Sequence, residues 1–324
     1  MPDNASDIPA TLHYNLLGRT GLSVSALGLG GGGKSCLGRK TGLSEAQSAR
    51  VVKRALELGV NFIDTSARNG TEGIIGSAIR GEDRQRLVLS SKANVSIGET
   101  LVSAGQFAAS IDNSLRALGT AYIDIMQFHG VLPEEYDYML NELMPVMLQF
   151  QQAGKIRFIG LSEHFDRDRE HAMLQRALQD DYWDVLMVGY NLLNQTARRS
   201  IFPLTRERNI GVLCMFAVRR AFRTADAFRQ VIAELSASGD LPDDFDVDTL
   251  LGQLAGRSQS GSSVTDTAYR FCRDEQGIDS VLVGTGNIEH LEQNIASFHR
   301  PPLPAPTLRL IEQHFGHISD FSGN

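Results

Sequence analysis

The segment SEAQSARVVKRALELGVNFIDT, residues 44–65, contains the pattern that decides the fold. Ser44 and Gln47 have the spacing of a capping box, which predicts the start of a helix. The apolar stripe of that helix consists of Val51, Val52, Ala55 and Leu56. Gly59 predicts its end, and the apolar run 60–65 that follows predicts a buried strand. An amphipathic helix that leads directly into a buried strand is half of a βαβ unit.

The same alternation runs along the whole chain. Apolar runs that predict buried strands lie at 24–30, 60–65, 86–92, 122–129, 156–162, 183–191, 210–216 and 280–286. Helical patterns lie at about 44–58, 71–80, 103–118, 138–153, 166–179, 197–208, 263–274 and 288–298. Eight strands alternating with eight helices require parallel pairing, in either a doubly wound sheet or a closed barrel. Eight units in about 280 residues favour an α/β fold of the (β/α)8 (TIM) barrel type, with residues 1–324 as a single domain.

Two segments fall outside this alternation. Residues 12–25 predict a β-hairpin ahead of the first strand, with GRTG as its turn. Residues 219–262 predict a long loop inserted before the seventh helix, which could cover the mouth of the barrel as a lid. Because this insertion is long, acidic and contains Gly and Ser, we expect it to be mobile without ligand.

Composition narrows the class of protein. The 324 residues carry a formal net charge of −7 and no basic run, which argues against a nucleic-acid partner and against an anionic membrane surface. No apolar run has the length of a membrane span, and the first residues lack a signal-peptide pattern. The three cysteines, Cys36, Cys214 and Cys272, form no CxxC pair and predict reduced thiols. We therefore expect a cytoplasmic protein, and its oligomeric state has no signal in the sequence.

One motif invites a different reading. Residues 28–35, GLGGGGKS, match the phosphate-loop pattern GxxxxGK[ST]. That chemistry needs a helix that begins at the lysine, so that its first amides meet the phosphate. Here the chain continues as CLGRKTG, and the next helix is predicted to begin near Ser44. The sequence therefore argues against a nucleotide hydrolase.

Three titratable residues end consecutive predicted strands. Asp64, Lys92 and His129 close the second, third and fourth apolar runs. In a barrel, these strand ends converge on one patch at the C-terminal mouth. A Lys–Asp ion pair beside a histidine can polarise a carbonyl oxygen and move a proton. The three residues are candidate catalytic groups.

At this point the sequence resembles the aldo-keto reductase family over nearly its whole length. The resemblance rests on LGRTGLSVSALGLG near the start, GVNFIDTS around Asp64, SSK at Lys92, DIMQFH at His129, GKIRFIGLS at Ser162, YNLLN at 190–194 and GTGNIEHLEQN at 284–294. It implies a (β/α)8 barrel that binds extended NADPH and transfers hydride to a carbonyl substrate or from an alcohol.

The resemblance also implies roles for the candidate catalytic residues. Lys92 and Asp64 match residues that lower the pKa of a catalytic tyrosine, and His129 matches the residue that orients the substrate carbonyl. The position of the tyrosine itself, five residues after the aspartate and just before a glycine, is Asn69. An asparagine amide can donate a hydrogen bond but not a usable proton.

The implied cofactor site departs from the family pattern as well. Ser162 and Glu163 occupy the positions of the family's Ser-Asn pair that holds the nicotinamide carboxamide. Met187 stands where the family has a nearby glutamine. Met215 occupies the position of the family's tyrosine that stacks on the nicotinamide. His290 occupies the position of the arginine that lies beside the 2′-phosphate. Further residues implied to contact the cofactor are Gly30, Gly31, Asp64, Gly284, Thr285, Gly286, Asn287, Gln293 and Asn294. NADPH is the implied cofactor, and NADH remains open.

Four hypotheses follow for the activity. The first is an oxidoreductase whose proton comes from His129, from water or from the substrate. The second is a catalytically weak barrel that binds the cofactor and acts as a sensor or binding partner. The third is an enzyme in which Lys92 and Asp64 carry out non-redox chemistry on a carbonyl compound, and the fourth is an introduced Tyr→Asn change. The parallel departures at Glu163 and Met215 favour divergence of the whole pocket, and the first hypothesis leads.

Overall fold

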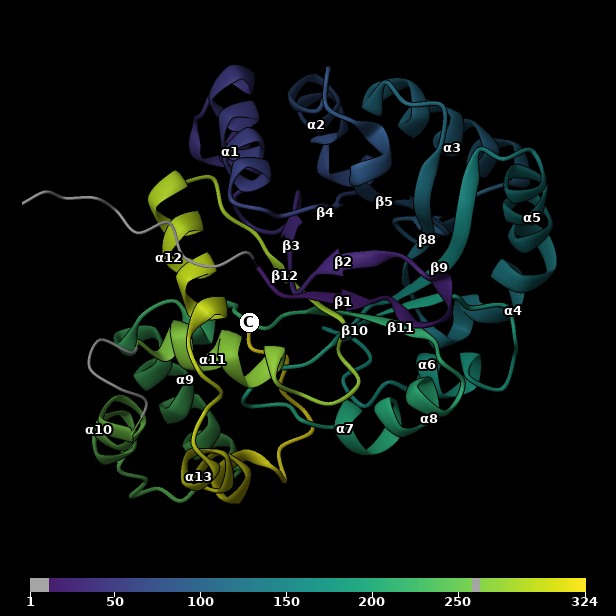
Figure 1. Cartoon of the computed structure of the whole chain (residues 1–324). Helices are drawn as coiled ribbons and strands as arrows, with labels where there is room; N and C mark the ends of the chain where they lie inside the picture. Colours follow the sequence, from purple (N-terminus) through teal and green to yellow (C-terminus); the bar gives the residue numbers. More distant parts are fainter. Residues whose placement is uncertain (1–11, 258–262) are drawn as a thin grey trace, which may run out of the picture.

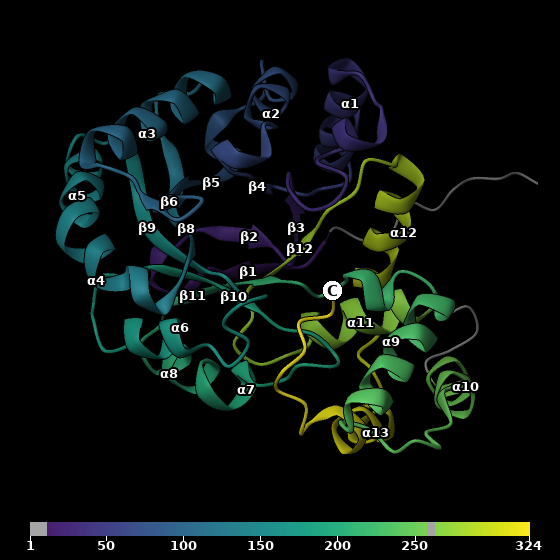
Figure 2. The ribbon, with the colours of Figure 1, turned by 180° about the vertical axis from the view of Figure 1, so that it is seen from behind.

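The structure is a computed structural model that describes residues 12–257 and 263–324. Eight parallel strands close into a barrel in the order β10-β11-β12-β3-β4-β5-β8-β9, and helices surround them (Figures 1 and 2). The strands are β3 (Leu27–Gly30), β4 (Phe62–Asp64), β5 (Val88–Asn94), β8 (Ile123–Val131), β9 (Ile156–Glu163), β10 (Val185–Gly189), β11 (Gly211–Met215) and β12 (Ser280–Val283). This architecture confirms the predicted (β/α)8 barrel.

The outer helices begin and end close to their predicted positions. They are α1 (Glu45–Glu57), α2 (Glu72–Ala78), α3 (Ala104–Leu118), α4 (Tyr136–Tyr138), α5 (Met144–Gln152), α6 (Ala172–Ala177), α7 (Ala197–Ser200), α8 (Phe202–Glu207), α11 (Val264–Arg273) and α12 (Ile288–His299). The capping box of α1 forms, because Gln47 N donates to Ser44 Oγ and Ser44 N donates to Gln47 Oε1. Among the residues described, no helix is both long and apolar enough to cross a membrane.

Two predicted helices differ from a regular α-helix of the expected length: one changes its hydrogen-bond register, and the other is shorter. The pattern at 138–153 contains a π-helical stretch, Met139–Leu143, shortly before Pro145. Proline has no N–H to donate back into the helix, which explains why the hydrogen-bond register changes there. The pattern at 166–179 is helical only in α6, since His171 takes a left-handed φ of 64° immediately before it.

The predicted hairpin closes the N-terminal end of the barrel. Strands β1 (Tyr14–Leu16) and β2 (Ser23–Ser25) pair antiparallel around a 3-10 turn. Gly18 in that turn has a φ of 47°, and a Cβ on it would lie 2.2 Å from the backbone N of Gly211. The hairpin and the strands share an apolar cluster of Leu17, Leu22, Val24, Phe62, Val88, Ile125, Val185, Met187 and Leu213. This plug leaves the opposite, C-terminal end for the site.

The inserted segment 219–262 is not the loop that we predicted. It contains two helices, α9 (Ala225–Ser238) and α10 (Val247–Arg257), and its residues 258–262 lie outside the described part. Phe228 of α9 is fully buried and makes an edge contact with Phe315 of α13 (Ala305–Phe315), a helix that we did not predict. The apolar positions of α9 recur at helical spacing, a signal that the acidic composition of the segment concealed. Its role as a lid stays a prediction.

The last residues of the chain turn back onto the barrel. Asn194 Nδ2 donates to Ser319 O at 2.9 Å, and Asn191 Nδ2 donates to Ser322 O at 3.0 Å. The label C lies beside the barrel strands in both views (Figures 1 and 2). Because Asn191 and Asn194 follow β10, residues 319–324 lie against the C-terminal ends of the strands.

Candidate active site

Polar side chains line the upper half of the barrel interior. The residues that share one face are Val88, Ser90, Lys92 and Asn94 on β5, and Ile125, Gln127 and His129 on β8. Since strand side chains alternate with a period of two, the polar residues point the same way as Val88 and Ile125, which belong to the interior plug. The parallel register pairs Lys92 with Gln127 and Asn94 with His129. The structure therefore brings these groups together above the plug, as the strand ends predicted.

Lys92 and Asp64 form a buried ion pair. Lys92 Nζ lies 2.6 Å from both carboxylate oxygens of Asp64 and 2.8 Å from the carbonyl oxygen of Thr65. Their side chains are only 5% and 7% exposed. Burial raises the pKa of Asp64, while the charge and hydrogen bonds of Lys92 act in the opposite direction. Three acceptors thus match the three N–H donors of the ammonium group.

A second layer of hydrogen bonds holds the carboxylate of Asp64. Ser90 Oγ donates to Asp64 Oδ1 at 2.9 Å, and Gln127 Nε2 donates to Ser90 Oγ at 2.7 Å. A buried ion pair is stable only when its geometry and its remaining hydrogen bonds are satisfied. Ser90 and Gln127 supply that support. The sequence analysis missed both, although each lies two residues before a predicted site residue and so shares its face.

His129 lies beside this pair and is neutral. Its Nδ1 is 2.8 Å from Asn94 Oδ1, which fixes the plane of the ring. Burial, followed by the positive charges of Lys92 and Arg68, lowers the pKa of His129 to about 3. A pKa this low argues against the hypothesis that His129 titrates near neutrality and supplies the proton, because the imidazolium form is unfavourable at this position. Because Asn94 Oδ1 can only accept, Nδ1 of the neutral ring carries the proton, and Nε2 is an acceptor that can take a hydrogen bond from a substrate hydroxyl.

Asn69 sits at the same end of the barrel. It ends the 3-10 turn Ala67–Asn69 that follows β4, and its side chain is partly exposed. A Cβ on Gly32 would lie 2.7 Å from Asn69 Nδ2, so the amide packs directly against the loop after β3. Arg39 of that loop also donates to the carbonyl oxygen of Asn69 at 3.3 Å. Asn69 thus joins the loops that follow β3 and β4.

The glycine-rich run after β3 is explained in part by the packing of the protein itself. The backbone N of Gly31 donates to Asp64 O at 2.6 Å. A Cβ on Gly31 would lie 2.8 Å from Thr71 Oγ1 and 3.0 Å from Thr65 Oγ1. A Cβ on Gly30 would make only ordinary contacts, the nearest at 3.6 Å. Close packing against the two threonines thus accounts for the glycine at Gly31, and the contact of Gly30 and Gly31 with the cofactor stays a prediction.

No helix begins at the lysine of the phosphate-loop match. Residues 33–38 form turns, and α1 begins only at Glu45. Gly38 in this segment lies against Gly286. A Cβ placed on Gly286 would come within 2.3 Å of Gly38 Cα. The backbone of the β3–α1 loop thus packs against the chain after β12. The exclusion of a phosphate loop is confirmed.

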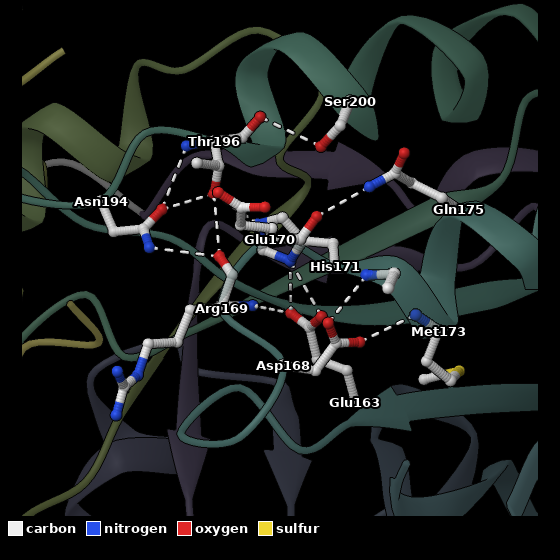
Figure 3. A network of polar contacts seen from close by, with 12 residues as sticks. Glu163, Asp168, Arg169, Glu170, His171, Met173, Gln175, Asn194, Thr196 and Ser200 are labelled. Carbon is white, nitrogen blue, oxygen red and sulfur yellow. Dashed lines mark hydrogen bonds and ion pairs between the residues drawn. The ribbon is translucent and has the colours of Figure 1, made fainter. Parts of the chain in front are cut away.

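Glu163 belongs to a buried network rather than to the open mouth (Figure 3). Its carboxylate lies 2.9 and 3.0 Å from His171 Nδ1, and it accepts a hydrogen bond from Gly189 N at 2.7 Å. His171 Nε2 lies 2.9 Å from Thr196 Oγ1. Burial raises the pKa of Glu163, and His171 and Gly189 act against that shift. Because a buried carboxylate needs such partners, Glu163 faces His171 and β10, and its contact with the cofactor stays a prediction.

The same network locks the loops after β9 and β10 together. Asp168 accepts hydrogen bonds from Ala172 N and Met173 N, both at 2.8 Å, at the start of α6. Asn194 Nδ2 donates to Arg169 O at 3.2 Å (Figure 3). The Asn194–Arg169 hydrogen bond joins the two loops, whereas the hydrogen bonds of Asp168 lie between the loop after β9 and the start of α6. They give this side of the mouth a fixed shape.

The remaining predicted cofactor residues fall into two groups. Ser162 and Met187 pair in register across β9 and β10, and Met215 ends β11 with its side chain partly exposed. In the ring of eight strands β11 lies opposite β5, so Met215 faces the site across from Lys92. The second group, Gly284, Thr285, Gly286, Asn287, His290, Gln293 and Asn294, runs from the end of β12 into α12. The structure thus places the two groups at the same end of the barrel.

The second group borders a surface hollow of about 310 Å3 between α1 and α12. Asn287 Oδ1 accepts from His290 N at 3.0 Å and caps α12. The hollow is lined by Leu43, Gln47, Arg50, Val51, Gly286, Asn287, Ile288 and Glu289. Arg50, which is exposed, was not among the predicted residues, because nothing in the sequence distinguishes it from other charged residues on the solvent face of α1.

A parallel barrel whose polar residues gather at the C-terminal ends of its strands, above an apolar plug, defines a (β/α)8-barrel enzyme. The family model described as Aldo/keto reductase family matches residues 27–315. The chain belongs to the aldo/keto reductase family, which is a family of oxidoreductases that use a nicotinamide cofactor and a small-molecule substrate.

Similar proteins agree with this assignment. The chain is 26% identical over 295 residues to "L-galactose dehydrogenase" of Arabidopsis thaliana, covering 88% of each chain. It is 25% identical over an aligned length of 340 residues to "L-glyceraldehyde 3-phosphate reductase" of Escherichia coli (strain K12), covering 94% of this chain and 92% of the other. The fold resembles the holo form of aldo-keto reductase AKR11C1 from Bacillus halodurans, with a TM-score of 0.73, 23% identity and coverage of 97% and 100%.

Proposed function

We propose that this protein is an NADPH-dependent oxidoreductase that transfers hydride between the dinucleotide and a small carbonyl or alcohol substrate. The observation that carries the proposal is the buried Lys92–Asp64 pair beside neutral His129, at the mouth of an aldo/keto reductase barrel. A preorganised ammonium group in a site with little water stabilises negative charge that develops on a carbonyl oxygen.

The residues present fit a nicotinamide dinucleotide. Ser162, near the end of β9, carries a hydroxyl that can hold the carboxamide. Met215 offers an apolar surface to the ring, and the exposed backbone of Gly284 lies next to the loop after β3. The hollow between α1 and α12 offers room, a guanidinium from Arg50 and the first amides of α12 to the adenosine end. A bound reduced nicotinamide supplies the hydride.

The side chains of this protein divide the remaining work. His129 positions the substrate by a hydrogen bond that its Nε2 accepts from a substrate hydroxyl, and Lys92 with Asp64 sets the electrostatic field around the reacting carbon–oxygen bond. Asn69 donates a hydrogen bond from its amide but keeps its protons. The proton that completes alcohol formation then comes from water or from the substrate itself. We expect this step to limit turnover.

Titration of the purified protein with NADPH tests the proposal, with NADH in parallel. We expect quenching of the fluorescence of the protein and saturation well below millimolar NADPH. Consumption of NADPH with a panel of simple aldehydes then reports turnover. Absence of binding of either dinucleotide at millimolar concentration would refute the proposal.

Asn69 favours a second candidate function, a barrel that binds the dinucleotide but turns over too slowly to serve as an enzyme. Such a protein would act as a sensor or binding partner. It is distinguished by saturable NADPH binding without consumption of NADPH on any aldehyde of the panel.

A further inference from the structure

His164 is a half-buried histidine beside His129 at the mouth of the barrel. It directly follows β9, and its backbone N donates to Val131 O at 3.3 Å. A Cβ on Gly130 would lie 3.8 Å from Cδ2 of His164, so the ring lies beside the residue that follows His129. Histidine is the side chain that most readily exchanges a proton near neutral pH. His164 is therefore a titratable group next to the candidate active site.

Alternation along β9 directs this ring into the mouth. Phe158 of β9 packs against the interior plug. Ser162 and His164 follow Phe158 at even spacing, and the side chains of a strand point to the same face at every second residue. Glu163, which lies between them, points the other way and contacts His171 (Figure 3). His164 therefore continues the row of interior side chains at the open end of the barrel.

A β-bulge brings His129 next to this ring. The pairing of β8 with β9 shifts in register between Phe128 and Val131, and His129 and Gly130 are the two residues between them. Bulges occur beside active sites, where they redirect a side chain. Gly130 has a φ of 60°, a conformation that favours glycine, and its lack of a side chain leaves the space beside the ring of His164 open.

The ring nitrogens of His164 are not held by the protein. Among the residues that the structure describes, none forms a hydrogen bond with this ring. The other two histidines in this region are held. His129 Nδ1 lies 2.8 Å from Asn94 Oδ1, and both ring nitrogens of His171 have partners within 3.0 Å. Of the three rings, that of His164 is therefore the one that can exchange a proton with water at either nitrogen.

The electrostatics agree with this proximity. Burial, then the charges of Lys92 and Arg68, and then the charge of His164 lower the pKa of His129. His164 is thus close enough to act on His129 through its charge. The titratable and charged groups on the elements around His164 are Asp64, Arg68, Lys92, His129, Glu134, Glu163, Asp166, Arg167, Asp168 and Arg219.

We propose that His164 is the proton donor of this site and acts through one bound water. Asn69 leaves no acid in direct contact with the carbonyl oxygen, because a carboxamide keeps its protons. A general acid that is one water away from the reacting oxygen still meets the distance that proton transfer requires. This proposal deepens the proposed function and rests on it, since it names the group that supplies the water with its proton.

Protons and electrons balance with this assignment. The carbonyl carbon accepts a hydride with its electron pair, and the π pair of the carbon–oxygen double bond becomes a lone pair on the oxygen. That oxygen takes a proton from the water, and the water takes one from the imidazolium of His164, whose N–H electron pair stays on nitrogen. Solvent protonates the imidazole again before the next turnover. In the direction of alcohol oxidation, the neutral imidazole takes the proton back through the same water.

The pH dependence of butanal reduction tests the proposal in the full chain with NADPH. The value of kcat/KM for the wild type should fall about tenfold per pH unit above one protonation step. His164→Gln should remove that step, lower kcat/KM below it by at least about tenfold and leave the Kd for NADPH unchanged. His13→Gln is the matched control and should keep the wild-type profile, because His13 is exposed next to β1, at the opposite end of the barrel.

Three further measurements distinguish proton transfer from a merely structural role. Free imidazole should restore activity to His164→Ala, and more so at low pH, where imidazole carries the proton. In the wild type, diethyl pyrocarbonate should abolish activity in step with carbethoxylation of His164, located by peptide mass spectrometry, and hydroxylamine should reverse both. Adding Asn69→Tyr should reduce the effect of His164→Gln, since a phenol then donates directly.

The outcomes separate this proposal from the function on which it rests. If the wild type binds no dinucleotide, the proposed function fails, and this proposal fails with it. If the wild type reduces butanal and His164→Gln keeps both the pH profile and the kcat/KM of the wild type, this proposal alone is overturned. If His164→Gln does not fold, the modification of the wild type decides, and inactivation that follows a residue other than His164 overturns the proposal.

Discussion

Replacing Asn69 with tyrosine should create the acid that this site lacks. Asn69 lies on the turn after β4, at the end of the barrel where Lys92 and Asp64 form their pair. A phenol has an unperturbed pKa near 10, and a nearby ammonium group lowers it. Its proton can be transferred to a developing alkoxide, whereas a carboxamide proton cannot. We therefore expect Asn69→Tyr to increase reductase activity on a simple aldehyde.

The structure sets the size of this gain. A general acid typically contributes about 10²- to 10⁴-fold to the rate. Here the three N–H donors of Lys92 already meet Asp64 Oδ1, Asp64 Oδ2 and Thr65 O at 2.6–2.8 Å. The ammonium group can therefore act on a phenol through its charge but has no free N–H to give it. The gain should therefore lie at or below the lower end of this range, and we expect it to be at least about tenfold in kcat/KM.

The assay is NADPH consumption with butanal at saturating cofactor, alongside the Kd for NADPH. Asn69→Phe is the matched control, because it adds the ring without the hydroxyl, and it should show no gain. Lys92→Met in the Asn69→Tyr background should remove the gain. The reasoning is refuted if Asn69→Tyr binds NADPH as tightly as wild type and reduces butanal no faster than Asn69→Phe.

Three further predictions concern stability and pH. Lys92→Met leaves the carboxylate of Asp64 buried without its counter-ion, and urea unfolding should show that the free energy of unfolding falls by about 3–5 kcal/mol. Adding Asp64→Asn to the same chain should restore part of this loss. An unchanged urea midpoint for Lys92→Met alone would contradict the buried pair. Because the pKa of His129 is lowered to about 3, the imidazole is neutral at working pH. The pH profiles of kcat/KM for the wild type and for His129→Gln should therefore have the same shape above about pH 6.5, and a decline in the wild type that is absent in His129→Gln would contradict this. Burial raises the pKa of Asp279 from 3.8 to about 6, so the folded state binds this proton more tightly than the unfolded chain and stability falls as pH rises between these values. Asp279→Asn should therefore increase the free energy of unfolding by roughly 1–3 kcal/mol at pH 8 and leave it unchanged at pH 3, and equal effects at both pH values would exclude titration of this group.

Local patterns in the sequence are enough to predict the barrel. The run 60–65 predicts a strand because it is apolar and follows Gly59 directly, and the structure has β4 at Phe62–Asp64. The acidic composition of the insertion predicts a loop, whereas Phe228 and its neighbours carry the helical spacing that the structure shows as α9. Periodicity is the more informative signal, since it reports the buried face directly.

The site was only partly predictable. Asp64 and Lys92 could be paired in advance because parallel strands end at one rim, and Ser90 could have been found by alternation. The Glu163–His171 contact depends on a left-handed turn at His171, which the sequence does not announce. Such contacts arise from tertiary packing between loops, where no local pattern exists.

The central claim is that this barrel still transfers hydride, although an amide stands at the position of the proton donor. The most direct test is to incubate the wild-type protein with butanal and NADPH that carries deuterium on one face of C4, and to analyse the alcohol by mass spectrometry and NMR. The account predicts one deuterium at the former carbonyl carbon, delivered from one of the two labelled faces only. Saturable binding of NADPH by the wild-type protein, with no deuterated alcohol formed from either labelled face, would contradict it.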